Sequence, residues 1–145
     1  MESEVRRRRT TSVRSVISER THSVTQYNNA VSRYLAAWNA VGSEAIAKAV
    51  AEAWTEDGTY TDPLADVRGH EGIQAAIEGA HEQFPGFEFR LKGEVDGNHH
   101  IARFSWDLVS TADGSSPAGG SDVITLAEDG RIKSVSGFLD RVPSA

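Results

Sequence analysis

Residues 75–91, AAIEGAHEQFPGFEFRL, contain the change of pattern that decides the fold. Up to Phe84, the apolar residues recur every three or four positions, which is the spacing of one helix face. Pro85-Gly86 ends this helix, and from Phe87 onward apolar residues alternate with charged ones, which is typical of a strand with one buried face. We therefore expect helices before this point and a sheet after it.

The first half of the sequence predicts three helices and one short strand. Tyr34 and Trp38 lie on the apolar stripe of the first helix, one turn apart. Between the second and third helices, TEDGTYTDPL (55–64) predicts a glycine turn and a short strand that stops at Asp62-Pro63. The three helices are expected over residues 25–42, 43–58 and 69–84.

The second half predicts a meander of four strands. His100, Phe104 and Trp106 share the inward face of the second of them, and Asp122 opens the inward face of the third. The strands are expected over residues 87–92, 99–108, 122–126 and 131–139. This order of elements predicts an α+β fold, in which three helices pack on one face of a curved antiparallel sheet.

Length and composition indicate one domain and a separate leader. The chain has 145 residues, and we expect the domain over residues 25–145. Residues 1–24, rich in Arg, Ser and Thr, have no apolar period and are interpreted as a disordered arm. No apolar run approaches the roughly 20 residues of a membrane helix, and the sequence contains no cysteine. We therefore expect a cytoplasmic protein without a membrane span.

The net charge of −6 is distributed unevenly along the sequence. Six arginines and three glutamates give the predicted arm a net charge of +3, whereas the other nine basic and 18 acidic residues give the domain −9. Binding to nucleic acid needs a basic face that contacts phosphates. The acidic domain therefore argues against nucleic acid as the main partner.

Three polar side chains stand where their neighbours are apolar: Tyr34, Asp62 and Asp122. A buried hydroxyl needs a partner, and burial of a carboxyl group raises its pKa and favours the neutral form, which can donate a proton. Proline holds Asp62 in an extended conformation, on the same side of the short strand as Tyr60. Each residue also has a purely structural explanation, since Asp-Pro is a common turn sequence and a tyrosine often bridges core and surface.

The sequence carries no motif for a metal or an organic cofactor, and we expect neither. His99 and His100 are adjacent in a predicted strand, so their side chains point to opposite faces and cannot readily share one ion. No Ser-His-Asp grouping, phosphate loop or dinucleotide fingerprint is present. On the inward face, His100 remains a candidate second acid or base, or a histidine with a partner in the core.

Five segments together resemble the nuclear transport factor two-like superfamily, and within it the SnoaL-like proteins and ketosteroid isomerase. They are YLAAWNA (34–40), AWTEDGTYTDPL (53–64), RGHEGIQAAI (68–77), FPGFEF (84–89) and SDVITLAEDGRIKSVSGF (121–138). The resemblance covers about residues 27–142 and implies a cone-shaped fold. This scaffold supports isomerases, cyclases and other enzymes, as well as proteins without catalysis.

The resemblance to ketosteroid isomerase implies roles for three residues. Tyr34 stands in the context of the oxyanion tyrosine, Asp62 directly precedes proline as the catalytic aspartate does, and Asp122 opens a late strand as the protonated aspartic acid does. In this chemistry a carboxylate removes a proton next to a carbonyl group, while two neutral donors hold the enolate oxygen. The implied substrate contacts are His100, Phe104, Trp106 and Trp38.

Two classes of function therefore remain open. The first is an isomerase or cyclase that acts on a small hydrophobic ligand with a carbonyl group. The second is a binding or interaction module without catalysis. In this case the pocket holds an apolar ligand, or is filled by the protein's own side chains. We also expect a homodimer, since Ile101 and Val109 lie on the outward face of a predicted strand.

Overall fold

The computed structural model describes residues 22–143. The arm predicted over residues 1–24 therefore lies outside the described part of the chain, apart from its last three residues. Ser23 caps the first helix: its side chain accepts from the Gln26 N–H, while the Gln26 side chain accepts from the Ser23 N–H. This reciprocal pair satisfies two backbone donors at the start of the helix.

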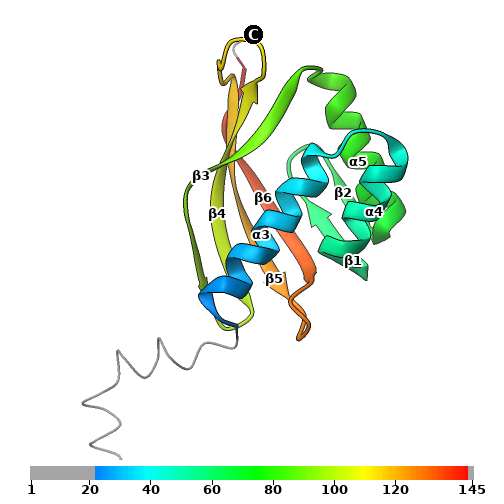
Figure 1. The fold of residues 1–145 in the computed structure, drawn as a ribbon, viewed down its shortest axis with the longest axis vertical. Helices are drawn as coiled ribbons and strands as arrows, with labels where there is room; N and C mark the ends of the chain where they lie inside the picture. The colour runs from blue at the N-terminus through cyan, green and yellow to red at the C-terminus, as the bar shows by residue number, and fades with distance from the viewer. Residues whose placement is uncertain (1–21, 144–145) are drawn as a thin grey trace, which may run out of the picture.

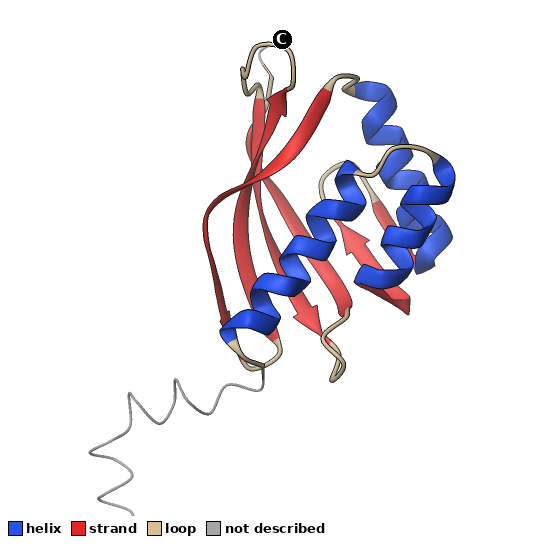
Figure 2. Cartoon of the chain, in the orientation of Figure 1, coloured by secondary structure: helices blue, strands red, loops and turns tan. Residues whose placement is uncertain are grey.

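Three helices and six strands make up the described part of the chain (Figure 2). The helices are α3 (Val24–Asn39), α4 (Ser43–Ala53) and α5 (Gly69–Gln83). The strands are β1 (Trp54–Thr61), β2 (Asp66–Arg68), β3 (Phe87–Asn98), β4 (Ile101–Ser110), β5 (Ala118–Leu126) and β6 (Ile132–Arg141). Within these residues, no helix is both long and apolar enough to cross a membrane.

The six strands form one sheet in the order β2-β1-β6-β5-β4-β3. The predicted α+β fold is confirmed: the helices lie on one side of a curved sheet (Figure 1). The sheet is mixed, because β1 pairs in parallel with β6 and the other neighbours are antiparallel. The register of β3 against β4 shifts between Lys92 and Asp96, and such irregularities help a strand to bend.

The boundary between α4 and β1 differs from the prediction. The second helix ends at Ala53 and not at Gly58, because Trp54 is extended and starts a strand that pairs with Ile132. The register shifts between Trp54 and Thr59, and a Cβ atom at Gly58 would lie 2.7 Å from the Trp54 ring. Gly58 is thus required by an irregular strand that folds closely over its own tryptophan.

The start of β4 also differs from the prediction. His99 and His100 form the turn between β3 and β4, and His99 has a positive φ of 47°. The strand begins at Ile101, and His100 is exposed in the turn. The expected inward orientation of His100 is therefore wrong, although Ala102 and Phe104 are buried as expected.

Val109, expected on an exposed face, is buried at the other end of β4. The loop over residues 111–117 folds back at this end, where the Ser110 N–H donates to the Ser115 carbonyl (2.8 Å). Ile101 is partly exposed, as predicted. Of the two apolar residues expected on the outward face of β4, only Ile101 is thus exposed to solvent.

The core lies between the three helices and the inner face of the sheet. The Tyr27 ring packs so closely on β3 that a Cβ atom at Gly97 would lie 2.5 Å from Tyr27 Cγ, and the Tyr27 hydroxyl donates to the His99 carbonyl (2.9 Å). The largest side chains in the core that are fully buried are Trp54, Tyr27, Ile46, Ile73, Ile77, Ile124, Leu126 and Ile132.

We predict that Gly97→Ala lowers the free energy of unfolding by about 1–3 kcal/mol, because the new methyl group overpacks the Tyr27 ring. Gly79→Ala is the matched control: Gly79 lies in α5 with no atom within 4 Å of an added Cβ, so alanine should stabilise the helix by about 0.5–1 kcal/mol. Urea denaturation should show a lower free energy of unfolding for Gly97→Ala and a higher one for Gly79→Ala than for the wild type. Equal stability of Gly97→Ala and the wild type would contradict the packing described for Tyr27.

Candidate active site

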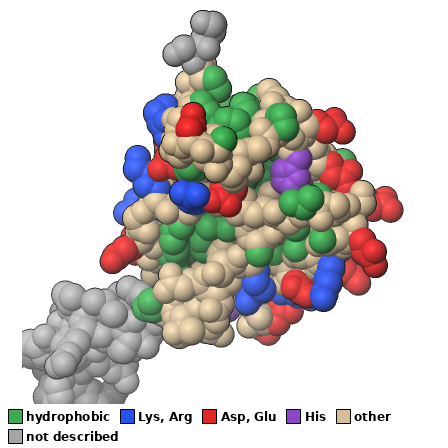
Figure 3. All heavy atoms as spheres, turned by 45° about the horizontal axis from the view of Figure 1, so that its top comes forward, with side chains coloured by type: hydrophobic (Ala, Val, Ile, Leu, Met, Phe, Trp, Pro, Cys, Tyr) green, Lys and Arg blue, Asp and Glu red, His purple; other side chains and the backbone are tan. Residues whose placement is uncertain are grey.

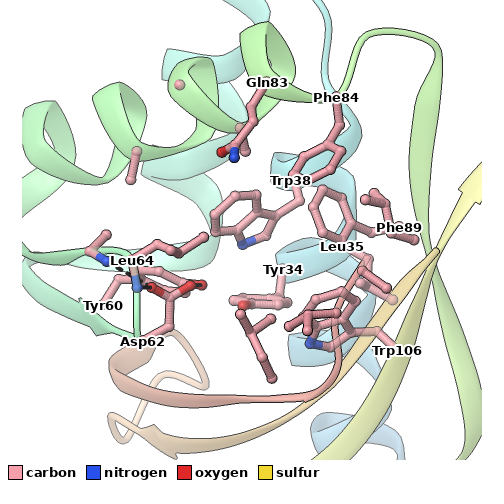
Figure 4. A pocket seen from close by; sticks show the side chains of 18 of the residues that line it. Tyr34, Leu35, Trp38, Tyr60, Asp62, Leu64, Gln83, Phe84, Phe89 and Trp106 are labelled. Carbon is pink, nitrogen blue, oxygen red and sulfur yellow. Dashed lines mark hydrogen bonds between the residues drawn. The ribbon is translucent and has the colours of Figure 1, made fainter. Parts of the chain in front are cut away.

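A cavity of about 620 Å³ lies between α3, α5 and the inner face of the sheet. This volume is within the range of sites that hold small molecules. The rings of Trp38, Phe84, Phe89 and Trp106 line much of the wall (Figure 4). Apart from the indoles, the polar side chains on the wall are those of Tyr34, Tyr60, Asp62 and Gln83.

The cavity opens toward the end of the molecule that carries the C-terminus. Leu64, Val142 and Pro143 line it and are exposed to solvent. Figure 3 turns this end forward and shows apolar side chains gathered on the face, with many of the acidic ones along one edge. The opening is therefore apolar, which suits the entry of a hydrophobic molecule.

The deepest polar contact joins α3 to β5. The Tyr34 hydroxyl donates to Asp122 Oδ2 at 2.7 Å, and both side chains are buried. Tyr34 lines the cavity, whereas Asp122 lies behind it and is not part of the wall. Asp122 is therefore connected to the cavity through its hydrogen bond with Tyr34.

Asp62 lies on the cavity wall at the end of β1. Its Oδ1 atom accepts from the backbone N–H groups of Leu64 and Ala65, each at 2.8 Å, which closes the turn after Pro63. Its Oδ2 atom accepts from the Tyr60 hydroxyl at 2.5 Å. The turn thus fixes one oxygen, and the second, held by a tyrosine, faces the cavity (Figure 4).

Gly137 on β6 brings the two aspartates together. A Cβ atom at this position would lie 2.7 Å from Asp122 Oδ1 and 3.3 Å from Asp62 Cβ. A side chain here would push Asp122 away from Tyr34 or displace the end of β1. The absence of a side chain at Gly137 is therefore a condition for this arrangement of carboxylates.

Burial controls the protonation of the site. It raises the pKa of Asp122 to about 6, although the Tyr34 hydroxyl and the Trp106 indole act to lower it. Burial and the neighbouring Asp122 raise the pKa of Tyr34 well above its ordinary value, and burial with the hydrogen bond to Asp62 raises the pKa of Tyr60. Both tyrosines therefore keep their protons at neutral pH and act as donors.

Two contacts fix the end of α3 over the cavity. The Asn39 side chain donates to the Phe89 carbonyl and accepts from the Phe89 N–H, both at 2.8 Å. His81 of α5 donates to the Trp38 carbonyl (2.5 Å). The C-terminal turn of α3 is thus tied to β3 on one side and to α5 on the other, which holds the cavity open between them.

The predicted site residues separate into two groups. Tyr34, Asp62, Trp38 and Trp106 line the cavity, and Asp122 supports Tyr34 from behind. The other two predicted substrate contacts do not line it. Phe104 is buried against the Tyr34 ring, with the ring centres 5.3 Å apart, and His100 lies in the turn between β3 and β4.

Sequence reasoning missed three residues that shape the site. Tyr60 was placed on the same side as Asp62, and the structure adds that its hydroxyl bonds to that carboxylate. The sequence gives no signal for Gly137, whose role depends on two distant aspartates, and the only signal for His81 was its position near an apolar stripe. The contacts of Gly137 and His81 cross between elements that are far apart in the sequence, whereas Tyr60 and Asp62 are two residues apart and only the orientation of their side chains had to come from the structure.

The chemistry available on the wall is hydrogen bonding and proton transfer. Asp62 offers a carboxylate acceptor, and Tyr34, Tyr60 and Trp38 carry the nearest buried donor groups. Across residues 22–143, no group of three or more His, Asp or Glu side chains is arranged to hold a metal ion.

We predict that the buried Asp122 makes the protein less stable as the pH rises from about 4 to 6. The folded state binds this proton more tightly than the unfolded state does, so stability falls between the ordinary pKa of 3.8 and the raised one, and is constant above it. The full change is on the order of 3 kcal/mol. Asp122→Asn removes the titration, so the stability of the wild type relative to this variant should fall by that amount between pH 4 and pH 7 in urea denaturation. A difference that does not vary with pH would contradict this assignment.

Comparison with known proteins agrees with this fold. Residues 31–135 match the SnoaL-like domain family. The structure is similar to a proposed isomerase of the SnoaL-like family from Agrobacterium tumefaciens, with 46% sequence identity and a TM-score of 0.76, over 80% of this chain and 98% of that one. No curated protein matches the sequence.

Two more distant structures share the fold. A proposed SnoaL-like polyketide cyclase from Jannaschia is 21% identical, with a TM-score of 0.65, over 80% of this chain and 86% of that one. A proposed polyketide cyclase from Sinorhizobium meliloti is 17% identical, with a TM-score of 0.58, over 80% and 99%. The fold resemblance inferred from the sequence is thus confirmed, and the chain belongs to the SnoaL-like family.

Proposed function

We propose that the protein is an enzyme that moves a proton next to the carbonyl group of a small hydrophobic molecule, as an isomerase or a cyclase. One observation carries this proposal: Asp62 and Tyr34 both line the same apolar cavity. A carboxylate and a neutral donor in one apolar site are the two groups that enolate formation requires.

In the proposed reaction, Asp62 acts as the general base. Its carboxylate takes a proton from the carbon next to the carbonyl group, and the electron pair of that C–H bond moves to the carbonyl oxygen as an enolate. Isomerisation follows when the proton returns to a different carbon. Cyclisation follows when the enolate carbon forms a bond to a second carbonyl carbon of the same molecule. The π bond of that second carbonyl group then breaks, and its oxygen takes the proton back from Asp62.

Tyr34 and Asp122 together would stabilise the enolate oxygen. When Asp122 is neutral, its proton can be donated to the Tyr34 oxygen, which frees the Tyr34 proton for the ligand. When Asp122 is ionised, the Tyr34 proton is directed toward Asp122 and away from the cavity. We therefore assign to Asp122 a role through Tyr34, and not direct contact with the ligand.

The relatives support the reaction class at a coarse level. One is described as a proposed isomerase and two as proposed polyketide cyclases. Isomerisation and cyclisation next to a carbonyl group can both begin with the enolate step, in which a proton is removed from the adjacent carbon. The apolar wall and opening of the cavity suit a small hydrophobic ligand with a carbonyl group.

A binding module without catalysis is the second candidate, and one observation favours it. Asp62 already accepts three hydrogen bonds, from Leu64, Ala65 and Tyr60. A carboxylate that accepts three hydrogen bonds is able to hold a turn in place without taking part in any reaction. In this case the cavity would bind an apolar molecule and leave it unchanged.

We also propose that the protein forms a homodimer through the outer face of its sheet. Val123 of β5 and Phe138 of β6 are exposed on this face together with Ile101, and Phe138 is 61% exposed. Solvent-exposed apolar side chains grouped on one sheet face are typical of an interface. Sedimentation equilibrium of the wild type and of Phe138→Ser tests this proposal, since only the wild type should dimerise.

Deuterium exchange tests the catalytic proposal without knowledge of the natural substrate. The probe is 2-acetylnaphthalene, an aryl ketone whose methyl protons exchange with D2O through the enolate. We expect the wild type to accelerate this exchange, and Asp62→Asn to reduce the acceleration by about 10²–10⁴-fold. Tyr34→Phe should reduce it by about 10²–10³-fold. Proton NMR of the methyl signal gives the rates.

Asp66→Asn is the matched control for Asp62→Asn. Asp66 is exposed on β2, bonds to Thr61 and does not line the cavity, so exchange should be unchanged. Asparagine at position 62 keeps an oxygen for the Leu64 and Ala65 N–H groups, so the turn should persist. Binding of the ketone without accelerated exchange by the wild type would refute catalysis and favour the binding module.

A further inference from the structure

We infer that the Trp38 indole N–H is a ligand-binding donor, which holds the carbonyl oxygen of a planar cyclic or aryl ketone at the polar end of the cavity. The inference rests on the proposed function, because it assigns an oxygen contact and an orientation to the ligand of the same cavity. It adds a third donor beside Tyr34 and Tyr60, and it restricts the class of ligand.

The first observation is that the N–H group of Trp38 is buried without a partner. Trp38 is 6% exposed, and Nε1 makes no hydrogen bond of normal geometry among residues 22–143, although it lies close enough to Tyr34 to act against the rise in the pKa of that hydroxyl. An indole can only donate, and a buried donor without an acceptor is unfavourable. Trp38 also lines the cavity, and its ring nitrogen is turned toward the Tyr34 hydroxyl and the Asp62 carboxylate (Figure 4).

The second observation is that the neighbouring donors are already engaged. The Tyr34 hydroxyl donates to Asp122 and the Tyr60 hydroxyl donates to Asp62, at 2.7 and 2.5 Å. Each hydroxyl has one proton, so while the two aspartates are ionised a ligand oxygen would have to compete with a carboxylate for it. Of these three buried groups, the Trp38 indole holds the N–H that a ligand can use without breaking an existing hydrogen bond.

Trp54 shows that an unpaired N–H alone does not identify a ligand site. Its Nε1 also has no partner in the described part of the chain, and its side chain is fully buried. The Trp54 ring packs against Tyr34, with the ring centres 5.4 Å apart, and does not line the cavity. The position of Trp38 on the cavity wall is therefore the distinguishing feature, and Trp54 provides a matched control.

The Trp38 side chain is held in place without a ligand. Its ring packs between Tyr60 and Phe89, with ring centres 5.2 Å away in both cases. Its carbonyl accepts from His81, and the adjacent Asn39 is bonded twice to Phe89. A donor whose direction is already fixed loses little conformational entropy when a ligand binds.

The surrounding groups define the class of ligand. Asp62 is an acceptor when ionised, so a ligand oxygen cannot face it, whereas the carbon next to the carbonyl group can. With the oxygen at Trp38 and this carbon at Asp62, the rest of the molecule extends along the rings of Phe89 and Trp106 toward the opening. Aromatic walls favour flat ring systems, and we therefore assign a planar cyclic or aryl ketone.

Two measurements with 2-acetylnaphthalene test this inference. The chain contains three tryptophans, so an indole-¹⁵N-labelled protein gives three indole N–H signals, which Trp38→Phe and Trp54→Phe help to assign. Saturation with the ketone should move the Trp38 signal downfield. Infrared spectra of the ketone labelled with ¹³C at the carbonyl should show a lower C=O stretching frequency when it is bound to the wild type and Trp54→Phe than to Trp38→Phe.

Affinity gives a third readout. Loss of one hydrogen bond should weaken binding of the ketone to Trp38→Phe by roughly 3- to 10-fold, and Trp54→Phe should bind as the wild type does. If Trp38→Phe fails to fold, the indole signals of the wild type still decide the question.

The possible failures are distinguishable. If the ketone binds and undergoes exchange while the Trp38 signal and the C=O frequency do not change, this inference is overturned and the proposed function stands. If the wild type neither binds the ketone nor accelerates exchange, the proposed function fails, and the inference fails with it.

Discussion

The buried hydrogen bond between Tyr34 and Asp122 is the constraint on which the rest of the site depends. A carboxyl group inside an apolar core is unfavourable unless it has a partner, and a buried hydroxyl needs one too. Each therefore fixes the other, and with them the position of α3 over β5. Gly137 must have no side chain so that Asp122 can occupy this position, and the end of β1 packs against the same glycine.

The cavity lies between α3, α5 and the curved sheet, and α3 is fixed at both of its ends. Tyr27 packs on Gly97 at the first end, and Asn39 bonds to Phe89 at the other. Between these points, large aromatic rings line the cavity, which neither α5 nor the sheet fills. Aromatic side chains are suited to this use, since they are rigid and cover a large apolar area.

Periodicity accounts for what the sequence predicts well. The 3.6-residue spacing located three helices, and alternation located the long strands and put Phe104 and Asp122 on the inner face. The errors lie where a local pattern gives way to a tertiary contact. Trp54 continues the apolar stripe of α4, yet it pairs with β6, and His100 continues the alternation of β4, yet it lies in a turn.

The candidate site could also be predicted only in part, because a local pattern identifies single residues but not the contacts between distant ones. Tyr34, Asp62 and Asp122 stood out because each is polar at an apolar position, which a single sequence reveals. That Asp122 lies behind Tyr34, and that Gly137 lets it approach Asp62, depends on how β1, β5 and β6 meet in space. No spacing along the chain encodes that meeting.

The two aspartates show how one scaffold separates the properties of identical side chains. Asp122 has a hydroxyl partner and almost no access to water, so its protonation depends on burial. Asp62 lies at the end of a strand, where two backbone N–H groups and Tyr60 hold the carboxylate next to the cavity. The proposed proton transfer therefore uses both kinds of position: a carboxylate at the wall that a ligand can reach, and a buried carboxyl group that sets the direction of a tyrosine proton.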